Sequence, residues 1–215
     1  MDLSRLNKEQ QEAVKHMEGP LLILAGAGSG KTTMMTHRIA YMLEKGVSPY
    51  NILAVTFTNK AAGEMKDRIE SLTGGTRGMW VMTFHAMCVR ILRNHGEVLG
   101  FKNGFSIYDE SDKKALLKRI VKDLKIDEKI YPISYLGSVI SSCKEAEEDP
   151  DDYIENNSMN FKAETVAKVY ARYMEDLQQN NAMDFDDLLW NAVKLFEASS
   201  EVLSYYQERF KYIMV

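Results

Sequence analysis

The chain has 215 residues, of which 45% are hydrophobic and 27% charged, and its net charge is −4. This composition is typical of a globular protein with a sizeable core, and it argues against a protein that coats nucleic acid through bulk positive charge. Apolar runs fall short of the roughly 20 residues that a membrane span needs, and no signal-peptide pattern opens the chain. We therefore expect a soluble, cytoplasmic protein without a membrane partner.

The positions of the cysteines and of the charged residues indicate the compartment and limit the kinds of site to expect. Cys88 and Cys143 lack metal-ligand spacing and the four histidines form no cluster in the sequence, so we expect a reducing compartment and no metal site built from side chains alone. Residues 1–85 carry a charge of +2 and residues 86–209 a charge of −7. Any contact with nucleic acid must then be a local patch.

The first predicted element is a short amphipathic helix over residues 6–14. Asn7 is a favourable N-cap, and Gln10 falls at the N3 position of a capping box. Gly19 and Pro20 end this helix before an apolar run, residues 21–24, that predicts a buried strand.

A loop of small residues follows that run and leads into a predicted helix over residues 31–43. Strand, loop and helix in this order make an anion cradle, because backbone N–H groups of the loop and of the helix N-terminus converge on a phosphate. Lys31 would reach the terminal phosphates, and the Thr32 hydroxyl would bind Mg²⁺. Ala25 stands where the strict phosphate-loop pattern has glycine. A glycine-rich turn without a ligand is the alternative.

Two further buried strands are predicted, over residues 52–57 and 79–84, with a helix over 60–72 between them. Strands that alternate with helices form a parallel sheet with right-handed crossovers. From residue 86 the pattern becomes helical, over roughly 86–98, 111–125, 133–146, 162–180, 184–197 and 200–209, and its one exception is a brief extended piece at residues 105–108. Strand character returns at residues 212–215.

We therefore expect three parts: an α/β part over residues 1–85, a helical insertion over 86–209, and a return strand over 210–215. A buried strand that stops at its last apolar residue lacks the following loop, where α/β sheets place ligands. For that reason we expect the chain to be a piece of a longer protein.

Four motifs resemble those of superfamily 1A DNA helicases, the UvrD/PcrA/Rep family, and the resemblance covers essentially all 215 residues. They are Leu6-Asn7-Lys8-Glu9-Gln10 (the Q motif), Ala25–Thr32 (the phosphate loop, with the family's alanine), Thr56–Met65 (motif Ia) and Thr83-Phe84-His85-Ala86 (motif Ib). The resemblance implies a RecA-like parallel sheet with helices on both faces, called subdomain 1A, and an inserted all-α subdomain, called 1B.

The resemblance also implies ATP and Mg²⁺ as cofactors, with a glutamine that hydrogen-bonds the adenine edge. The residues implied for the nucleotide are Gln10, Ala25, Gly26, Ala27, Gly28, Ser29, Gly30, Lys31, Thr32 and Thr33, with Lys31 and Thr32 also catalytic and Thr32 on Mg²⁺. In the family an arginine often stands at the position of Thr33, so its contact is missing here or supplied by another residue.

Single-stranded DNA and its junction with duplex are the implied partners. The residues implied for DNA are Phe57, Thr58, Asn59, Lys60, Thr83 and His85. Bases stack on aromatic rings, and helix N-termini accept backbone phosphates. Phe57 as a core aromatic and His85 as a structural histidine are the alternatives.

Two patterns in the predicted insertion allow both a structural and a functional interpretation. Lysines at 114, 118, 122 and 125 form one helical stripe, which is either a solvated face or a phosphate contact. Asp184, Asp186 and Asp187 could pass for a carboxylate site, but a helix cap at Asp184 fits better.

The resemblance implies an ATP-dependent 3′→5′ DNA helicase that translocates on single strands. In the family, the carboxylates for Mg²⁺ and for the attacking water follow the strand that ends here at Val215, and the second motor domain lies beyond. We therefore expect this chain alone to bind nucleotide and to hydrolyse it poorly. A phosphate-loop nucleotide or nucleoside kinase, a non-catalytic nucleic-acid-binding module and a helicase–nuclease stay open as alternatives.

Overall fold

The protein was analysed as a computed structural model, which describes residues 2–26 and 28–215. Contacts divide the chain into two compact units. The sheet unit comprises the residues up to Met87 together with Leu203–Val215, and the helical unit comprises Cys88–Val202. Helices α4 (Phe84–His95) and α10 (Ser200–Arg209) each contribute residues to both units. The domain limits expected after residues 85 and 209 stay predictions.

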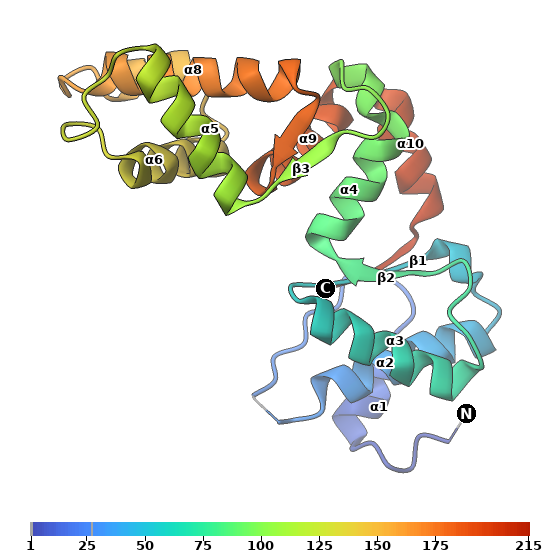
Figure 1. The fold of residues 1–215 in the computed structure, drawn as a ribbon. Coiled ribbons are helices and arrows are strands. Elements are labelled where there is room, and N and C mark those ends of the chain that lie inside the picture. Colours follow the sequence, from blue (N-terminus) through green and yellow to red (C-terminus); the bar gives the residue numbers. More distant parts are fainter. Residues whose placement is uncertain (1, 27) are drawn as a thin grey trace. The chain divides into compact units, whose positions relative to one another are not determined.

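The sheet unit is built on three parallel strands, β1 (Ile52–Thr56), β2 (Trp80–Thr83) and β5 (Tyr212–Met214), in the order β2-β1-β5 (Figure 1). Leu53 lies opposite Trp80 on one side and Ile213 on the other. β1 is the central strand, and its first four residues are buried. The predicted parallel sheet is thus confirmed.

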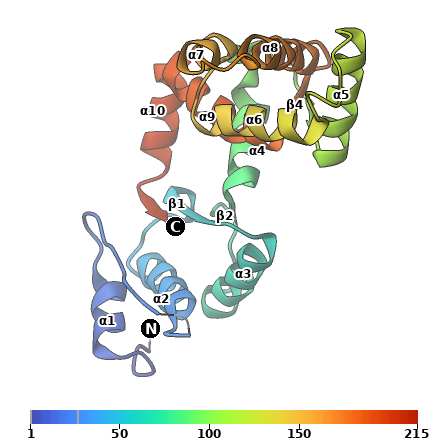
Figure 2. The ribbon, with the colours of Figure 1, turned by 90° about the vertical axis from the view of Figure 1, so that its left-hand side faces the viewer.

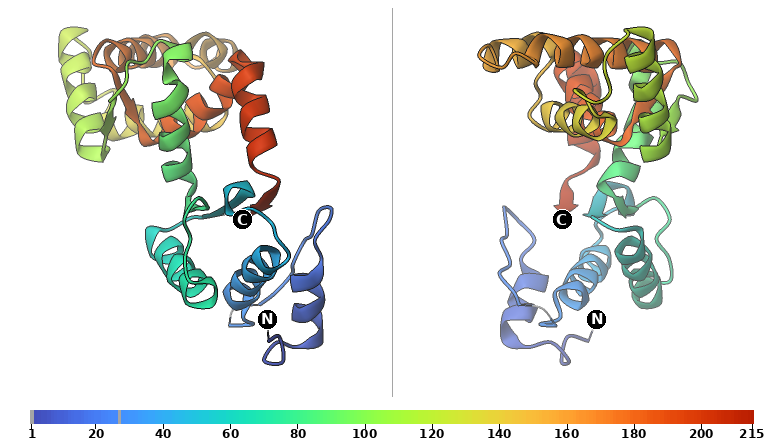
Figure 3. Two further views of the ribbon diagram at one scale, coloured as in Figure 1. Left: turned by 90° about the vertical axis from the view of Figure 1, so that its right-hand side faces the viewer. Right: turned by 60° about the vertical axis from the view of Figure 1, so that its left-hand side comes forward.

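Side chains alternate across the sheet and pack on different partners. Ile52 and Ala54 face a core formed with α2 (Lys31–Glu44) and α3 (Asn59–Thr73). Trp80 packs on Phe210, with ring centroids 4.9 Å apart, and on Tyr206. Figure 3 shows α2 and α3 beside each other below the strands.

The predicted strand over residues 21–24 is wrong for this structure. The segment has no strand conformation, and Leu22 and Leu24 are 83% and 88% exposed. A strand needs a hydrogen-bonded neighbour, and an apolar run by itself does not specify one. Here a cleft of about 420 Å³ lies between this segment, α2 and β5.

The first helix, α1 (Lys8–Lys15), packs against α2. Val14, Leu6 and Met34 form a small buried cluster between the two helices. Asn7 and Gln10 make both bonds of the predicted capping box. The sequence-based interpretation of this segment is confirmed.

Most of the helical unit matches the predicted periodicity. Its elements after α4 are the 3₁₀ turn Gly96–Leu99, β3 (Ser106–Tyr108), α5 (Glu110–Asp123), α6 (Ile133–Glu145), α7 (Pro150–Asn156), α8 (Ala163–Gln179), β4 (Ala182–Asp184) and α9 (Phe185–Ala198). Figure 2 shows α6 alongside α8, which it contacts. Leu136, Ile140 and Tyr173 lie in the core between these helices.

A pair of short strands corrects the expected all-α insertion, and one helix was not expected. β3 and β4 pair in parallel, with Ser106 opposite Ala182 and Tyr108 opposite Asp184. Residues 150–156, which lie outside the expected helical ranges, form α7, capped by Asp149. β3 lies within the extended piece expected at residues 105–108, whereas β4 was not expected, because its three residues lie between two strong helical patterns.

A buried ion cluster fixes the start of α9. Lys144, whose side chain is fully buried, lies 2.9 Å from Asp184 and 2.6 Å from Asp187. Asp184 accepts the backbone N–H of Asp187 and the hydroxyl of Tyr173. Asp184 is the N-cap of α9, so its predicted capping role is confirmed.

The pKa values of Asp184 and Asp187 are shifted in opposite directions. Burial raises the pKa of Asp187 to about 6, because the loss of water outweighs the attraction of Lys144. Burial also works to raise the pKa of Asp184, but Lys144 and further hydrogen bonds outweigh it, so that pKa is lowered. The cluster is held by attraction between buried charges, as expected for a structural site.

Candidate nucleotide and DNA site

The loop before α2 has the backbone of a phosphate cradle. Gly30 is the N-cap of α2, with φ 84°, and Gly28 has φ 77°. Both values are left-handed conformations that glycine adopts without strain. Because Gly30 has no side chain, the first N–H groups of α2 carry no side-chain cap and can serve an anion. Ala27, also predicted for this loop, lies outside the described residues.

Lys31 folds back over this loop. Its ammonium donates to the carbonyl oxygens of Ala25 and Gly26, at 2.7 Å each. The Gly26 carbonyl also accepts the Ser29 hydroxyl, at 2.7 Å. These contacts bring Ala25, Gly26 and Ser29 around the ammonium, where phosphate oxygens could replace the two carbonyls as its partners.

Thr32 and Thr33 differ in how accessible they are to a bound nucleotide or cation. Thr32 is exposed in the first turn of α2, so its hydroxyl is accessible to a hard cation such as Mg²⁺. Thr33 is half-buried, and its carbonyl accepts the Thr36 hydroxyl and contacts the His37 ring. Arg38 lines the cleft beside Lys31, yet its guanidinium donates to the Ala13 carbonyl and its pKa is lowered by burial.

Gln10 connects α1 to the phosphate loop. Its Nε2 donates to the Ser29 carbonyl at 2.9 Å, and its Oε1 accepts the backbone N–H of Asn7 at 3.0 Å. The loop passes so close that a Cβ at Gly30 would lie 3.0 Å from the same Nε2. The structure therefore brings the Q-motif glutamine to the phosphate loop.

The carboxyl ends of β1 and β2 carry the two segments predicted for DNA. Parallel strands end at the same edge of a sheet, so the residues after Thr56 and Thr83 emerge side by side. Phe57 is 82% exposed and lies against Phe84, with ring centroids 5.5 Å apart. Phe84 is thereby a further candidate for this contact, in addition to the residues predicted for DNA. Its signal was its position directly after a buried strand.

Thr58, Asn59 and Lys60 follow Phe57 at the N-terminus of α3, and all three are exposed. The Thr58 hydroxyl accepts the backbone N–H of Ala61 at 3.1 Å and so caps α3. Asn59 and Lys60 occupy its first turn, where backbone N–H groups and a cation suit a phosphate.

Thr83 and His85 are less accessible than Phe57. Thr83 is buried, and its hydroxyl accepts the backbone N–H of Ala86 at 3.2 Å. This bond gives Thr83 a capping role at α4. His85 is half-buried. Their contact with DNA stays a prediction.

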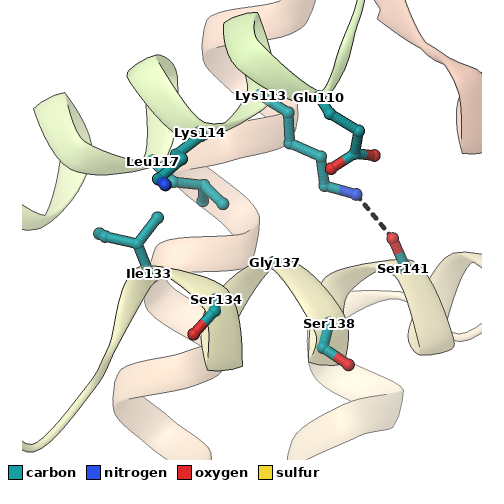
Figure 4. A pocket seen from close by; sticks show the side chains of 9 residues that line it. All are labelled: Glu110, Lys113, Lys114, Leu117, Ile133, Ser134, Gly137, Ser138 and Ser141. Carbon is teal, nitrogen blue, oxygen red and sulfur yellow. Dashed lines mark hydrogen bonds between the residues drawn. The ribbon is translucent and has the colours of Figure 1, made fainter.

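A second cleft, of about 400 Å³, lies in the helical unit between α5 and α6. Figure 4 shows Lys113 reaching from α5 to Ser141 of α6. Its ammonium also lies 2.9 Å from Asp186, so the positive charge is neutralised within the protein. Lys114 on the same cleft is exposed, as are Lys118, Lys122 and Lys125 of the lysine stripe.

The described residues contain neither a membrane-spanning helix nor a side-chain metal cluster. None of the described helices combines the length and apolar character of a membrane span. Within residues 2–26 and 28–215, no three His, Cys, Asp or Glu side chains gather as metal ligands would.

Comparison with known proteins shows the family of this chain. The model of the UvrD/REP helicase N-terminal domain matches residues 6–215. The ATP-dependent DNA helicase PcrA of Staphylococcus aureus (strain Mu50) is 49% identical over 216 residues, covering 99% of this chain and 29% of that protein. PcrA of Staphylococcus epidermidis (strain RP62A) shows the same identity and coverage. The chain thus spans less than a third of these relatives, and with the family match over nearly its whole length it belongs to the UvrD/REP helicase family.

Proposed function

We propose that this chain is the ATP-binding region of an ATP-dependent DNA helicase that moves 3′→5′ on single-stranded DNA and unwinds duplex at a junction. The observation that carries the proposal is the cradle at the N-terminus of α2, where Gly28 and Gly30 adopt left-handed conformations beside the Lys31 ammonium. The names of the relatives support ATP and DNA as its ligands.

The nucleotide would sit with its phosphates on this cradle. Loop N–H groups and Lys31 would balance the phosphate charge, and the Thr32 hydroxyl would complete the shell of Mg²⁺. Gln10 would hold the adenine edge. Bound Mg²⁺ would supply neutralisation of the charge that develops during phosphoryl transfer. The residues of this chain would thus bind and orient the triphosphate.

Single-stranded DNA would bind at the carboxyl edge of the sheet. Phe57 offers exposed aromatic surface for a base, with the half-buried Phe84 ring packed against it, and Asn59 and Lys60 offer partners for a backbone phosphate. The edge is local and not part of a broadly basic surface, in accord with the net charge of −4.

The proposal includes slow hydrolysis by this chain alone. The residues around Lys31 supply a cation, hydroxyl groups and backbone N–H groups, while activation of the attacking water calls for a carboxylate or an equivalent group. The relatives are more than three times as long as the matched region, and the second motor domain of the family would act in cis.

The test measures binding and turnover on the purified chain. A fluorescent ATP analogue with Mg²⁺ should bind saturably and be displaced by ATP, and a labelled oligothymidylate should bind with strong salt dependence. ATP hydrolysis should stay near background with and without the oligonucleotide. Rapid hydrolysis stimulated by DNA would overturn the expected inactivity, and failure to bind any nucleotide would overturn the proposed function.

A further inference from the structure

The amide of Gln10 is held in one orientation by two neighbours. Its oxygen, Oε1, accepts the backbone N–H of Asn7 at 3.0 Å, and its nitrogen, Nε2, donates to the Ser29 carbonyl at 2.9 Å. An amide flipped by 180° would place its nitrogen against the N–H of Asn7 and its oxygen against a carbonyl. Both contacts would be repulsive, because each would pair two donors or two acceptors.

The side chain of Asn7 makes the reciprocal hydrogen bond, to the backbone of Gln10. Its Oδ1 accepts the backbone N–H of Gln10 at 2.8 Å, which fixes the first turn of α1 and the position of the Gln10 backbone. The pair is reciprocal, so loss of the Asn7 side chain weakens the cap that aims the amide.

Each end of the fixed amide keeps spare hydrogen-bonding capacity. Nε2 has a second N–H, and Oε1 has a second lone pair. Adenine presents one donor, N6, and one acceptor, N7, on the edge that an amide can pair with. Guanine presents two acceptors there, O6 and N7, so an amide in a fixed orientation leaves two acceptor oxygens facing each other.

We propose that Asn7 is a positioning residue for base selection, which keeps the Gln10 amide in the orientation that accepts adenine and rejects guanine. This inference rests on the proposed function, which places the adenine edge at Gln10. Asn7 acts through Gln10 and need not touch the nucleotide.

The experiment compares the affinities of mant-ATP and mant-GTP for the purified chain with Mg²⁺. The unchanged chain should prefer ATP. Asn7→Ala should reduce the GTP-to-ATP ratio of dissociation constants about fivefold, the change that corresponds to loss of a typical N-cap. Asn7→Asp, which keeps a hydrogen-bond acceptor at the cap, should retain the preference for ATP over GTP. Gln10→Ala should abolish it, and the double variant should match Gln10→Ala.

A matched control separates base selection from general loss of stability. Asp109 caps α5 in the helical unit through a capping box of the same type. Asp109→Ala should lower the unfolding midpoint, as Asn7→Ala does, and leave the ratio of the two affinities unchanged.

Each remaining outcome has a definite meaning. If Asn7→Ala weakens both nucleotides equally, or if the unchanged chain binds them without preference, the inference is overturned while the phosphate cradle stands. If the unchanged chain binds neither nucleotide, the inference and the proposed function are overturned together.

Discussion

The Lys31 ammonium lies 2.7 Å from the carbonyl oxygen of Gly26, five residues earlier in the chain. The loop is thus wrapped around its own lysine, and a second carbonyl, that of Ala25, completes the arrangement. A triphosphate would offer this ammonium charged oxygens in place of neutral ones, which gives shorter and stronger hydrogen bonds. Nucleotide binding is therefore expected to exchange these contacts within the loop.

Replacement of Lys31 should remove most of the affinity for nucleotide. We expect Lys31→Ala to weaken binding of mant-ATP by about 10- to 150-fold, because a hydrogen bond to a charged group contributes about 1.5–3 kcal/mol. Lys66→Ala on the exposed face of α3 is the control, and its affinity should stay within about twofold. Equal affinities of the two variants would show that the ammonium does not contact the phosphates.

Phe57 should dominate the contact with single-stranded DNA. Stacking of one base contributes about 1–3 kcal/mol, so Phe57→Ala should weaken binding of a labelled oligothymidylate by about 5- to 150-fold. Phe161, in the helical unit, is a control of the same residue type with nearly equal exposure, 83% against 82%. If Phe161→Ala weakens binding as much as Phe57→Ala does, the sheet edge is not the specific contact.

Lys144 should be essential to the stability of the helical unit. Lys144→Met leaves Asp184 and Asp187 buried without their shared cation, which should lower the free energy of unfolding by about 3–5 kcal/mol. Urea denaturation measures the change. Lys122→Met, at an exposed position, should change it by less than about 0.5 kcal/mol.

The loss in Lys144→Met should depend on pH. Burial already raises the pKa of Asp187 to about 6 despite Lys144, and loss of that cation raises it further above the unfolded value, whereas Asp184 keeps Lys113 at 3.9 Å. Stability contributed by such groups is greatest at low pH and is lost as pH rises through the folded pKa. The variant should therefore be destabilised more at about pH 8 than at about pH 5, and the opposite trend would contradict this account.

The two cysteines should be inert in the folded protein. Burial raises the pKa of Cys88 and of Cys143 to about 11, and both side chains are almost inaccessible. Because the thiolate is the reactive form, Ellman's reagent at about pH 8 should modify neither thiol until guanidinium unfolds the chain. Rapid modification of one thiol before unfolding would show that its unit opens locally.

Long periodic segments were predicted well, and short or partner-dependent ones were not. The periods of α2, α3, α5, α6, α8 and α9 gave helices close to the observed ones, since each buries a stripe of apolar residues. β4 was missed because its three residues lie between two strong helical patterns, predicted over 162–180 and 184–197. Residues 21–24 were predicted as a strand from their apolar character. A strand also needs a neighbouring strand for its backbone hydrogen bonds, and the sequence of one segment does not show whether such a neighbour is present.

In the candidate site, too, local features were predicted from the sequence and contacts between distant segments were not. Gly28, Gly30, Lys31 and Thr32 were identified by order and spacing, because the phosphate cradle is a local structure formed within a few residues. The approach of Gln10 to Ser29, and of Phe57 to Phe84, joins segments that are remote in the chain. Thr83, predicted for DNA, caps α4, a role that depends on the local geometry of its hydroxyl.

The amino-acid sequence by itself determined the family, the phosphate loop and the capping box of the first helix, since each depends on neighbours within a few residues or on motifs in a fixed order. Only the tertiary structure decided that the Gln10 amide faces the loop, that Lys144 lies between two buried carboxylates, and that β3 pairs with β4. Such contacts depend on how distant segments pack, and the free energy of that packing is a property of the whole fold.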